Sequence, residues 1–537
     1  MQDFRPGARA AAAAIAALTL TAALPAAAQT LTIGLSSEPT SLDPHYHNLG
    51  PNNALAKYIF GALVNQDAQQ RLQPGLAESW KAVDDTTWEF KLRQGVKFSD
   101  GSDFTAKDFV YTVCRIPAVV NAVSPFTLYT KSIAGIETVD DHTIRIKTAA
   151  PAPLLPTEMS TFVILSAEAN DAPDDLAFKA GGCDGITSPA SEAFLKPDVA
   201  IGTGPYKLRQ ATRGDRIVLE KNETYWGDEP AWAEIVMRPL TNPGARVAAL
   251  LAGDVDMIEN PPTQDIQRIE SSGFKIASGL SNRVIYIALD QGDAPTPGIA
   301  GDKNPLQDVK VREALSKAIN REAIKERIML GLSEPAGQLL PSPMFGTDPD
   351  RGPIPFDPDG AKALLAEAGY PDGFEITLGS PNDRYINDGQ IAQAVAQMWS
   401  RIGVKTSVDA KTASAFFADR NALKFSAYLA GWGAATGEMS SPIGALVATN
   451  DKARGLGGTN FARHSNKEID DLLLKALATV DDPAREKLLQ QAVGIAMDTW
   501  AIAPIHYELT TWAMKKDIDY EARADQYTLG YLATPAN

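Results

Sequence analysis

Side chains that commonly hold metals or carry out catalysis are sparse in this sequence. Of its five histidines, only His45 and His47 lie close together. Two imidazoles on one loop could contribute to a metal or haem site, but such a site also needs a cluster of carboxylate or thiolate ligands, which this loop lacks. We therefore expect no metal centre and no cofactor. We interpret the pair as part of a polar loop that lines a cleft or faces solvent.

Motifs of the common hydrolases and nucleotide-binding proteins are not found either. The sequence contains no G-x-S-x-G elbow, no H-E-x-x-H helix and no Walker loop. Adjacent acids such as Asp84-Asp85 and Asp140-Asp141 stand in turn contexts, where neighbouring side chains point apart and are poorly placed to act as an acid and base pair. We therefore predict a binding protein rather than an enzyme. Turnover would separate the two, because an enzyme releases product whereas a binding protein returns its ligand unchanged.

The first 28 residues have the features of an export signal. Arg5 and Arg9 give a positive start, residues 11–23 form an apolar stretch too short to span a bilayer, and three alanines before Gln29 offer a cleavage site. No cysteine follows the apolar stretch and no twin arginine is present, so we expect the general secretory route without a lipid anchor. A buried alanine-rich helix is the alternative. Export without lipidation predicts the periplasm of a Gram-negative cell.

The formal net charge of the chain is −16. Loss of the signal segment, with Asp3, Arg5 and Arg9, would make the mature chain one unit more negative. This charge argues against nucleic acid or an anionic membrane surface as a partner. It does not identify a ligand.

Two cysteines, Cys114 and Cys183, are the only thiols in the sequence. An even number of cysteines in an oxidising compartment predicts one disulfide. The alternative is a pair of buried thiols. Zinc is disfavoured because the two residues lack the spacing of metal ligands.

Several segments have clear secondary-structure signals. Residues 87–92 alternate apolar and polar side chains and predict a half-buried strand, and residues 96–98 continue the alternation after a turn. Thr105, with Asp108 three residues later, predicts a capping box and a helix through Val113.

The second half of the chain alternates helix and strand signals. Asp357 and Asp482 each precede a proline and are expected to cap helices, the first of which ends at Gly369. Further helices are expected at residues 311–319 and 469–476, and strands at 31–35, 374–378 and 404–408. Strands that fall between helices predict βαβ units with largely parallel pairing.

The stretch from 59 to 113, with LAESW before the strand and FSDGSDFTAKDF after it, closely resembles the extracytoplasmic binding proteins that serve peptide and nickel ABC importers (family 5). The resemblance continues in order along nearly the whole mature chain. It includes SLDP at 41–44, GTGPY at 202–206, LEKN at 219–222, LAGDVD at 251–256, VREALSKAI at 311–319 and ALLAEAGY at 363–370.

The resemblance implies an α/β fold of the two-lobed periplasmic binding protein type (class II-like, cluster C). The expected division is a signal peptide at 1–28, a first lobe at 29–282 plus 505–537, and a second lobe at 283–504. An extra subdomain is expected in the first lobe at about 74–197. Two chain segments would cross between the lobes and form the hinge.

The resemblance also implies ligand-binding residues. The segment around Arg384 and Tyr385 is similar to the family loop whose arginine receives a peptide carboxylate, a role that suits the two parallel donors of a guanidinium. The alternative for Arg384 is a surface or interdomain ion pair, for instance with Asp388. Further aromatic side chains are expected near the ligand, with core packing as the alternative for each; they are Tyr46, Trp432 and Trp512.

One position departs from the family pattern. Peptide-binding members place an aspartate in the loop at 431–438 to hold the ammonium group of the ligand, and here that place is Ala435. Glu438 is the nearest acid, and we expect it to compensate.

The resemblance therefore predicts a monomeric receptor that captures a small peptide or peptide-like solute and delivers it to membrane permease subunits. The first alternative keeps the fold and changes the ligand to an opine, an oligosaccharide or a metal chelate. The second is a chemosensory or chaperone-like binding protein. Fold alone does not choose among these, because function depends on the site.

Overall fold

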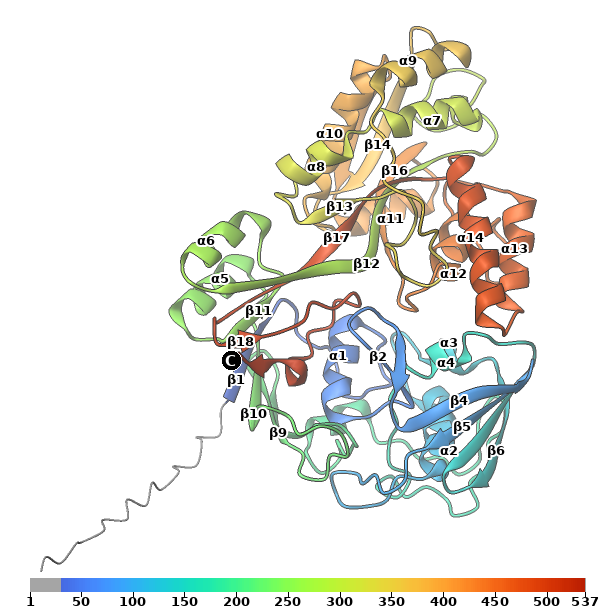
Figure 1. Cartoon of the computed structure of the whole chain (residues 1–537). Helices are drawn as coiled ribbons and strands as arrows, with labels where there is room; N and C mark the ends of the chain where they lie inside the picture. Colours follow the sequence, from blue (N-terminus) through green and yellow to red (C-terminus); the bar gives the residue numbers. More distant parts are fainter. Residues whose placement is uncertain (1–29, 537) are drawn as a thin grey trace, which may run out of the picture.

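The computed structural model describes residues 30–536, so the expected signal peptide lies outside the described residues. Figure 1 shows a mixed α/β molecule in which two long neighbouring strands, β12 (Lys275–Leu289) and β17 (Ala503–Met514), connect an upper and a lower part. Their antiparallel ladder runs from Lys275↔Met514 to Ile287↔Ala503. Its register shifts between Leu280 and Val284 and again between Ile285 and Tyr286.

Both parts share one 11-stranded sheet. In spatial order its strands are β15 (Lys405–Lys411), β14 (Glu375–Pro381), β16 (Ala427–Gly433), β12, β17, β11 (Met257–Glu259), β1 (Thr30–Leu35), β10 (Glu234–Pro239), β9 (Arg216–Lys221) and β8 (Tyr206–Thr212), with β13 (Ser333–Pro335) paired to β17.

The expectation of parallel pairing is confirmed for the two strands from which it was drawn, because β14 and β15 pair in parallel with α10 (Asp388–Arg401) between them, but it is wrong for most of the sheet. Only the pairs β1–β10, β1–β11, β14–β15 and β14–β16 are parallel within the described residues. Hairpins join β8, β9 and β10, and β12 runs antiparallel to both of its neighbours. The hairpins lie in the first half of the chain, outside the helix-and-strand pattern from which the expectation was drawn, and the pairing of β12 with the distant strands β16 and β17 has no local signal in the sequence.

Alternate residues of β12 serve two hydrophobic cores. Val284 and Tyr286 belong to the core that contains Leu473 of α13 (Lys467–Leu477) and Leu489 of α14 (Asp482–Asp498). Ile285 lies in the core on the other face of the sheet, with residues of α7 and α10. Apolar side chains on both faces explain why this segment has no simple alternation in the sequence.

A second sheet with its own core lies in the lower part of Figure 1. Its strands, all antiparallel, are β4 (Ala77–Asp84), β5 (Thr87–Leu92), β7 (Thr143–Thr148) and β6 (Ile133–Asp140). The predicted strand at 87–92 is β5, with Trp88 and Phe90 in the core. Residues 96–98 form no strand, although Val96 and Phe98 are buried; a single bridge joins Lys97 to Asp103.

The predicted helix starts agree with the structure at two of three positions. Thr105 and Asp108 form the capping box of α2 (Ala106–Arg115), and Asp357 caps α9 (Pro358–Glu367). The third cap is Asp481 rather than Asp482, which is the first residue of α14 (Asp482–Asp498). Two consecutive aspartates made the cap ambiguous by one residue.

The remaining elements are short or cover the sheets. The helices are α1 (Gly50–Ile59), α3 (Thr127–Thr130), α4 (Leu155–Glu158), α5 (Pro243–Ala252), α6 (Ile266–Ser271), α7 (Val309–Lys317), α8 (Arg321–Arg327), α10 (Asp388–Arg401), α11 (Ala413–Asn421), α12 (Ser440–Pro442) and α13 (Lys467–Leu477). The small strand pairs are β2 (Val64–Gln66) with β3 (Leu72–Pro74) and β18 (Ile518–Asp519) with β19 (Thr534–Pro535). Among residues 30–536, no helix combines the length and apolar character needed to cross a membrane.

Candidate functional site

The loop between β14 and α10 is fixed by the first residue of the helix. One carboxylate oxygen of Asp388 accepts hydrogen bonds from the backbone N–H groups of Arg384 and Tyr385, each at 3.0 Å. The Arg384 guanidinium is exposed and lies over the Tyr385 ring, 5.1 Å from its centroid. Asp388 therefore holds the loop backbone, and the structure shows no Arg384–Asp388 ion pair between the side chains.

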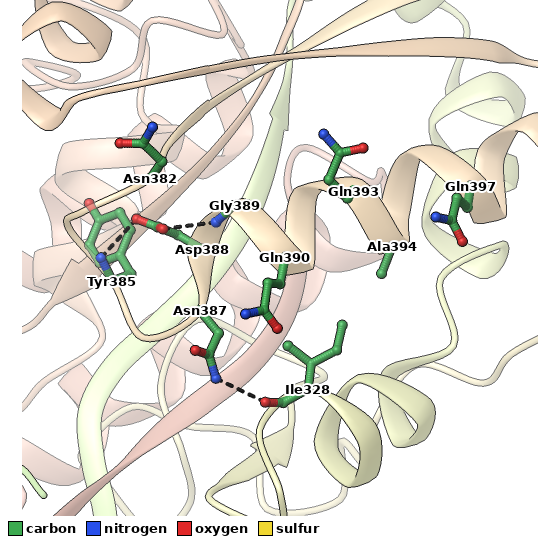
Figure 2. Close-up of a pocket in the computed structure, with 10 residues that line it drawn as sticks. All are labelled: Ile328, Asn382, Tyr385, Asn387, Asp388, Gly389, Gln390, Gln393, Ala394 and Gln397. Carbon is green, nitrogen blue, oxygen red and sulfur yellow. Dashed lines mark hydrogen bonds between the residues drawn. The ribbon is translucent and has the colours of Figure 1, made fainter. Parts of the chain in front are cut away.

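Tyr385 faces a different hollow from Arg384. Figure 2 shows this hollow, about 660 Å³, along the start of α10. Asn387 closes one side by donating to the Ile328 carbonyl at 2.9 Å. The Tyr385 hydroxyl donates to the Gly431 carbonyl at 3.2 Å, which fixes the ring against β16.

Arg384 lines a cavity of about 420 Å³ that both parts of the molecule build, called here the Arg384 cavity. The upper part contributes Arg384, the lower part contributes Ser36 and Glu259, and Arg283 of β12 lies between them. A ligand in this space would therefore contact groups of both charges.

Glu259 ends β11 and was not predicted from the sequence. It is half-buried, and its Oε1 accepts from the Ser36 N–H at 2.6 Å and the Ser36 hydroxyl at 2.7 Å, while the Thr528 hydroxyl donates to Oε2. These partners are neutral, and no salt bridge to the carboxylate forms in the described chain; the nearby Arg246 donates to the Glu259 backbone carbonyl at 3.0 Å. Its position at the end of a strand could have identified it as a candidate. β1 and β11 are parallel, and ligands commonly bind at the carboxyl ends of parallel strands.

Arg283 is a second cation of this cavity, but it has partners. Its Nε lies 3.3 Å from a carboxylate oxygen of Glu508 on β17, and its Nη2 donates to Gln526 at 3.1 Å. Glu508 also accepts from the Ile386 N–H at 3.2 Å. Burial raises the pKa of Glu508, and Arg283 opposes this rise. The cluster connects the Arg384 loop to the two long strands.

Glu438 does not lie in the Arg384 cavity. Its carboxylate is buried and pairs with Arg485 at 2.6 Å, and Ser440 donates to its other oxygen. It lines a separate cavity of about 500 Å³ with Phe345 and Trp80. Since its charge is already compensated, the structure does not support the expectation that Glu438 replaces the acid missing at Ala435.

Two of the predicted aromatic residues lie outside the described cavities. Trp432, in β16, is half-buried and donates from its indole N–H to the Ser441 hydroxyl at 3.2 Å. Tyr46 is half-buried, and its carbonyl accepts from the Val123 N–H at 3.0 Å. Their part in ligand binding stays a prediction.

Trp512 belongs to the core rather than to a ligand surface. Its side chain is 0% exposed and packs edge-on against Tyr520 with ring centroids 5.1 Å apart. The indole N–H donates to the Thr528 hydroxyl oxygen at 2.9 Å. The buried side chain belongs to a hydrophobic core, so it has no surface to offer a ligand in this structure, and a part in ligand binding stays a prediction.

His45 is also buried, contrary to the expected polar loop. Its Nε2 bonds the Val163 carbonyl at 2.9 Å, and Nδ1 accepts from Arg115 at 2.9 Å. Arg115 in turn makes two bonds to Asp43, at 3.0 and 2.9 Å. Burial and the Arg115 charge lower the pKa of His45 to about 3. The imidazole is therefore a structural group; His47, half-buried, meets the Thr40 hydroxyl at 2.9 Å.

The structure joins Cys114 and Cys183 in a disulfide, with their Cα atoms 5.4 Å apart. Cys114 is buried in α2, and Cys183 belongs to the long irregular segment that follows α4. The bond attaches that segment to the core of the second sheet. In residues 30–536 no cluster of three or more histidine, cysteine or acidic side chains has the arrangement of a metal site.

Residues 71–454 match the family model described as "Bacterial extracellular solute-binding proteins, family 5 Middle". The chain belongs to this family. Its family 5 relatives include the glutathione-binding protein GsiB of Escherichia coli (strain K12), which is 29% identical over 513 residues covering 94% of this chain and 93% of that protein.

Solved structures show the same fold. The MppA periplasmic murein tripeptide binding protein, in its unliganded open form, is 25% identical with a TM-score of 0.78, covering 95% of this chain and 98% of that chain. HbpA2 from Haemophilus parasuis is 24% identical with a TM-score of 0.78, covering 95% of this chain and 100% of that chain. This family 5 protein thus has the two-lobed α/β fold of extracellular solute-binding proteins.

Proposed function

We propose that this protein is the substrate-binding component of an ABC importer and captures a peptide or peptide-like solute. One observation carries the proposal: Arg384 and Glu259 line the same cavity from two parts of the molecule. A zwitterionic solute would place its anionic group at Arg384 and its cationic group at Glu259. Transport and ATP hydrolysis would belong to the membrane and ATPase subunits that receive the loaded protein.

The relatives support a ligand of this chemistry. Glutathione and a murein tripeptide, named for GsiB and MppA, both carry carboxylates and an amino group. In this chain the acid at Glu259 takes the role that Ala435 cannot fill. The Glu259 carboxylate is oriented by N–H and hydroxyl donors and forms no salt bridge in the described chain, so an ammonium group of the solute would be its ionic partner.

We further propose the lobes 29–282 plus 505–537 and 283–504, with the hinge where β12 and β17 cross between them and the inserted subdomain at about 74–197. The register shift between Leu280 and Val284 supports this position, because interrupted pairing lets a ladder bend locally. The separate core of the second sheet supports the subdomain. Closure of the lobes around the solute would present one shape to the permease.

The remaining parts of the proposal rest on the sequence and the family. We place the protein in the periplasm, as a monomer, exported by a cleaved signal peptide without a lipid anchor. We assign it no catalytic activity, because the matching family model and the relatives are described as binding proteins.

Native mass spectrometry of protein purified from its own periplasm would identify the solute that co-purifies. Calorimetry then compares that solute with forms lacking one charge, an N-acetylated form and a carboxyl-amidated form. Arg384→Ala should weaken binding of the parent solute by about 2 kcal/mol and binding of the amidated form far less. Glu259→Gln should likewise weaken binding of the parent solute, and should weaken binding of the acetylated form far less.

Matched controls are Arg401→Ala and Glu270→Gln, which remove exposed charges elsewhere on the surface. Both should bind like the parent protein. If Arg384→Ala or Glu259→Gln also binds like the parent protein, the assigned ligand orientation is wrong. A co-purifying solute with no ionic group would contradict the proposal that the ligand is zwitterionic.

A further inference from the structure

A further cavity, of about 440 Å³, lies entirely within the lower part of the molecule and shares no residue with the Arg384 cavity. It is enclosed by α1, β2, the segments 203–205 and 225–226, and the C-terminal segment 521–532. We call it the Lys57 cavity.

Three buried hydrogen-bond donors at this cavity have no partner among residues 30–536. They are the Thr203 hydroxyl, the Gln66 side-chain amide and the Trp226 indole N–H. Thr203 is 0% exposed. Buried polar groups nearly always have partners, so three unsatisfied donors on residues that line one cavity favour a ligand that brings a hydrogen-bond acceptor.

Lys57 adds a positive charge to the same space. Its ammonium donates to the Ser160 carbonyl at 3.3 Å, and no carboxylate in the described chain pairs with it. The other charged groups around it have partners: Arg523 binds Asp525 at 2.5 Å, and Asp67 binds Arg71 at 2.7 Å.

One acid lies at the rim. Glu521 is exposed and accepts from the Gln69 side-chain amide at 2.9 Å. It faces solvent, whereas Lys57 is shielded. Burial lowers the pKa of Lys57 to about 8, Asp525 opposes this shift and Arg523 adds to it.

Aromatic rings form much of the wall. Phe60, Tyr225, Trp226 and Tyr531 all line the cavity. Flat apolar faces next to a cation and several donors suit a planar molecule with one acidic group.

We propose that the Lys57 cavity binds a small carboxylate attached to a flat apolar group, with the carboxylate at Lys57 and the buried donors. This site would be independent of the solute bound between the lobes. The chemistry identifies the class of ligand, an aromatic or similarly flat monocarboxylate.

The test uses 4-bromobenzoate and its neutral analogue 4-bromobenzamide with the mature, folded protein. Crystals soaked with the acid should show anomalous bromine density in the Lys57 cavity, and calorimetry should detect binding in solution. Lys57→Met should weaken binding at least tenfold, the loss expected for one charge-assisted contact. Lys196→Met, which removes an exposed lysine charge, should bind the acid like the parent protein.

Two further readouts separate ligand binding from a structural role. Affinity should hold below pH 8 and fall above it, because Lys57 is protonated below its pKa of about 8. Trp226→Phe keeps an aromatic ring in the wall but removes the indole N–H, so it should weaken binding of the acid several-fold, and it provides a test even if Lys57→Met fails to fold.

Three outcomes would overturn the proposal. They are bromine density only elsewhere, equal affinity for the acid and the amide, and binding seen at crystal concentration only. An unchanged affinity in both Lys57→Met and Trp226→Phe would do the same.

Discussion

The indole of Trp512 and the carboxylate of Glu259 are linked through a single hydroxyl, that of Thr528. Trp512 donates to this oxygen at 2.9 Å, and the hydroxyl donates onward to Glu259. Trp512, which was predicted to contact the ligand, thus contacts Thr528 instead, and Thr528 contacts Glu259, the carboxylate that we assign to the ligand. The core tryptophan fixes the hydroxyl, and the hydroxyl orients the acid.

Thr528→Val tests this link. The substitution leaves the buried indole N–H without a partner and frees one oxygen of Glu259, so we expect a loss of stability of about 1–3 kcal/mol. Affinity for the zwitterionic solute should fall, but by less than in Glu259→Gln. Urea unfolding and calorimetry measure the two effects.

Thr510→Val is the matched control. Thr510 is also buried on β17, but its hydroxyl has no partner among the described residues, so its removal should cost little. Equal losses in the two variants would show that the Thr528 hydroxyl has no special role.

Glu438→Gln should affect stability rather than ligand choice. Glu438 and Arg485 form a buried ion pair at 2.6 Å, and removal of the Glu438 charge leaves the buried arginine with Asp482 as its remaining ionic partner, with an expected cost of about 3 kcal/mol. Asp482→Asn is the control, because Asp482 contacts the same arginine from an exposed position and should cost under about 1 kcal/mol. A folded Glu438→Gln protein that loses binding of amine-bearing solutes only would restore the original expectation for this residue.

Cys114 and Cys183 should be linked in protein isolated from the periplasm. Labelling in denaturant should find no thiol before reduction and two thiols after it. The two cysteines are 69 positions apart in sequence, and a closed loop of this size stabilises a fold by up to about 4 kcal/mol. Replacement of both by alanine should lower the free energy of unfolding toward that limit, whereas two reactive thiols in fresh, unreduced protein would contradict the bond.

His506 should make the protein less stable in mild acid. It is buried on β17, neither ring nitrogen has a partner in the described chain, and burial lowers its pKa to about 3. The unfolded chain, with a histidine pKa of about 6.5, binds the proton first. The free energy of unfolding therefore has its full value, as far as His506 is concerned, above about pH 6.5. It decreases as the pH falls from there toward 3.

His506→Leu isolates this effect. Between pH 7 and pH 5 the parent protein should lose about 2 kcal/mol more than the variant, since each pH unit within the window corresponds to about 1.4 kcal/mol. Urea unfolding at both pH values provides the comparison. Parallel losses in the two proteins would mean that His506 is protonated in the fold.

Solute binding should compact the molecule. Small-angle scattering should show a smaller radius of gyration with saturating solute, and the thermal midpoint should rise with the logarithm of solute concentration. A solute bound with micromolar affinity and no change in radius would argue against lobe closure.

Much of the fold could be predicted from local sequence patterns, whereas the candidate site depends on contacts between residues far apart in the sequence. Thr105 and Asp108 sit three residues apart, so their capping box could be predicted from the sequence. Glu259 could not be assigned, because its place beside Ser36 depends on the parallel register of β1 and β11, more than two hundred residues apart.

The errors have related causes. Glu438 is neutralised by Arg485, a partner 47 positions away that no local pattern reveals. For Trp512, sequence indicates an aromatic residue in a strand but not which face of the sheet it occupies. Only the strand pairing of β17 shows that Trp512 lies in the core.

The shared sheet limits how this protein can be divided. Because β12 and β17 pair along their lengths through both parts, neither part can be produced alone with its sheet complete. A fragment cut at Ser281 would keep part of each ladder and expose unpaired backbone on a long strand edge, the kind of surface that promotes self-association. Fragments made for crystallography, display or biosensor fusion should therefore keep both crossings, with insertions confined to loops away from these two strands.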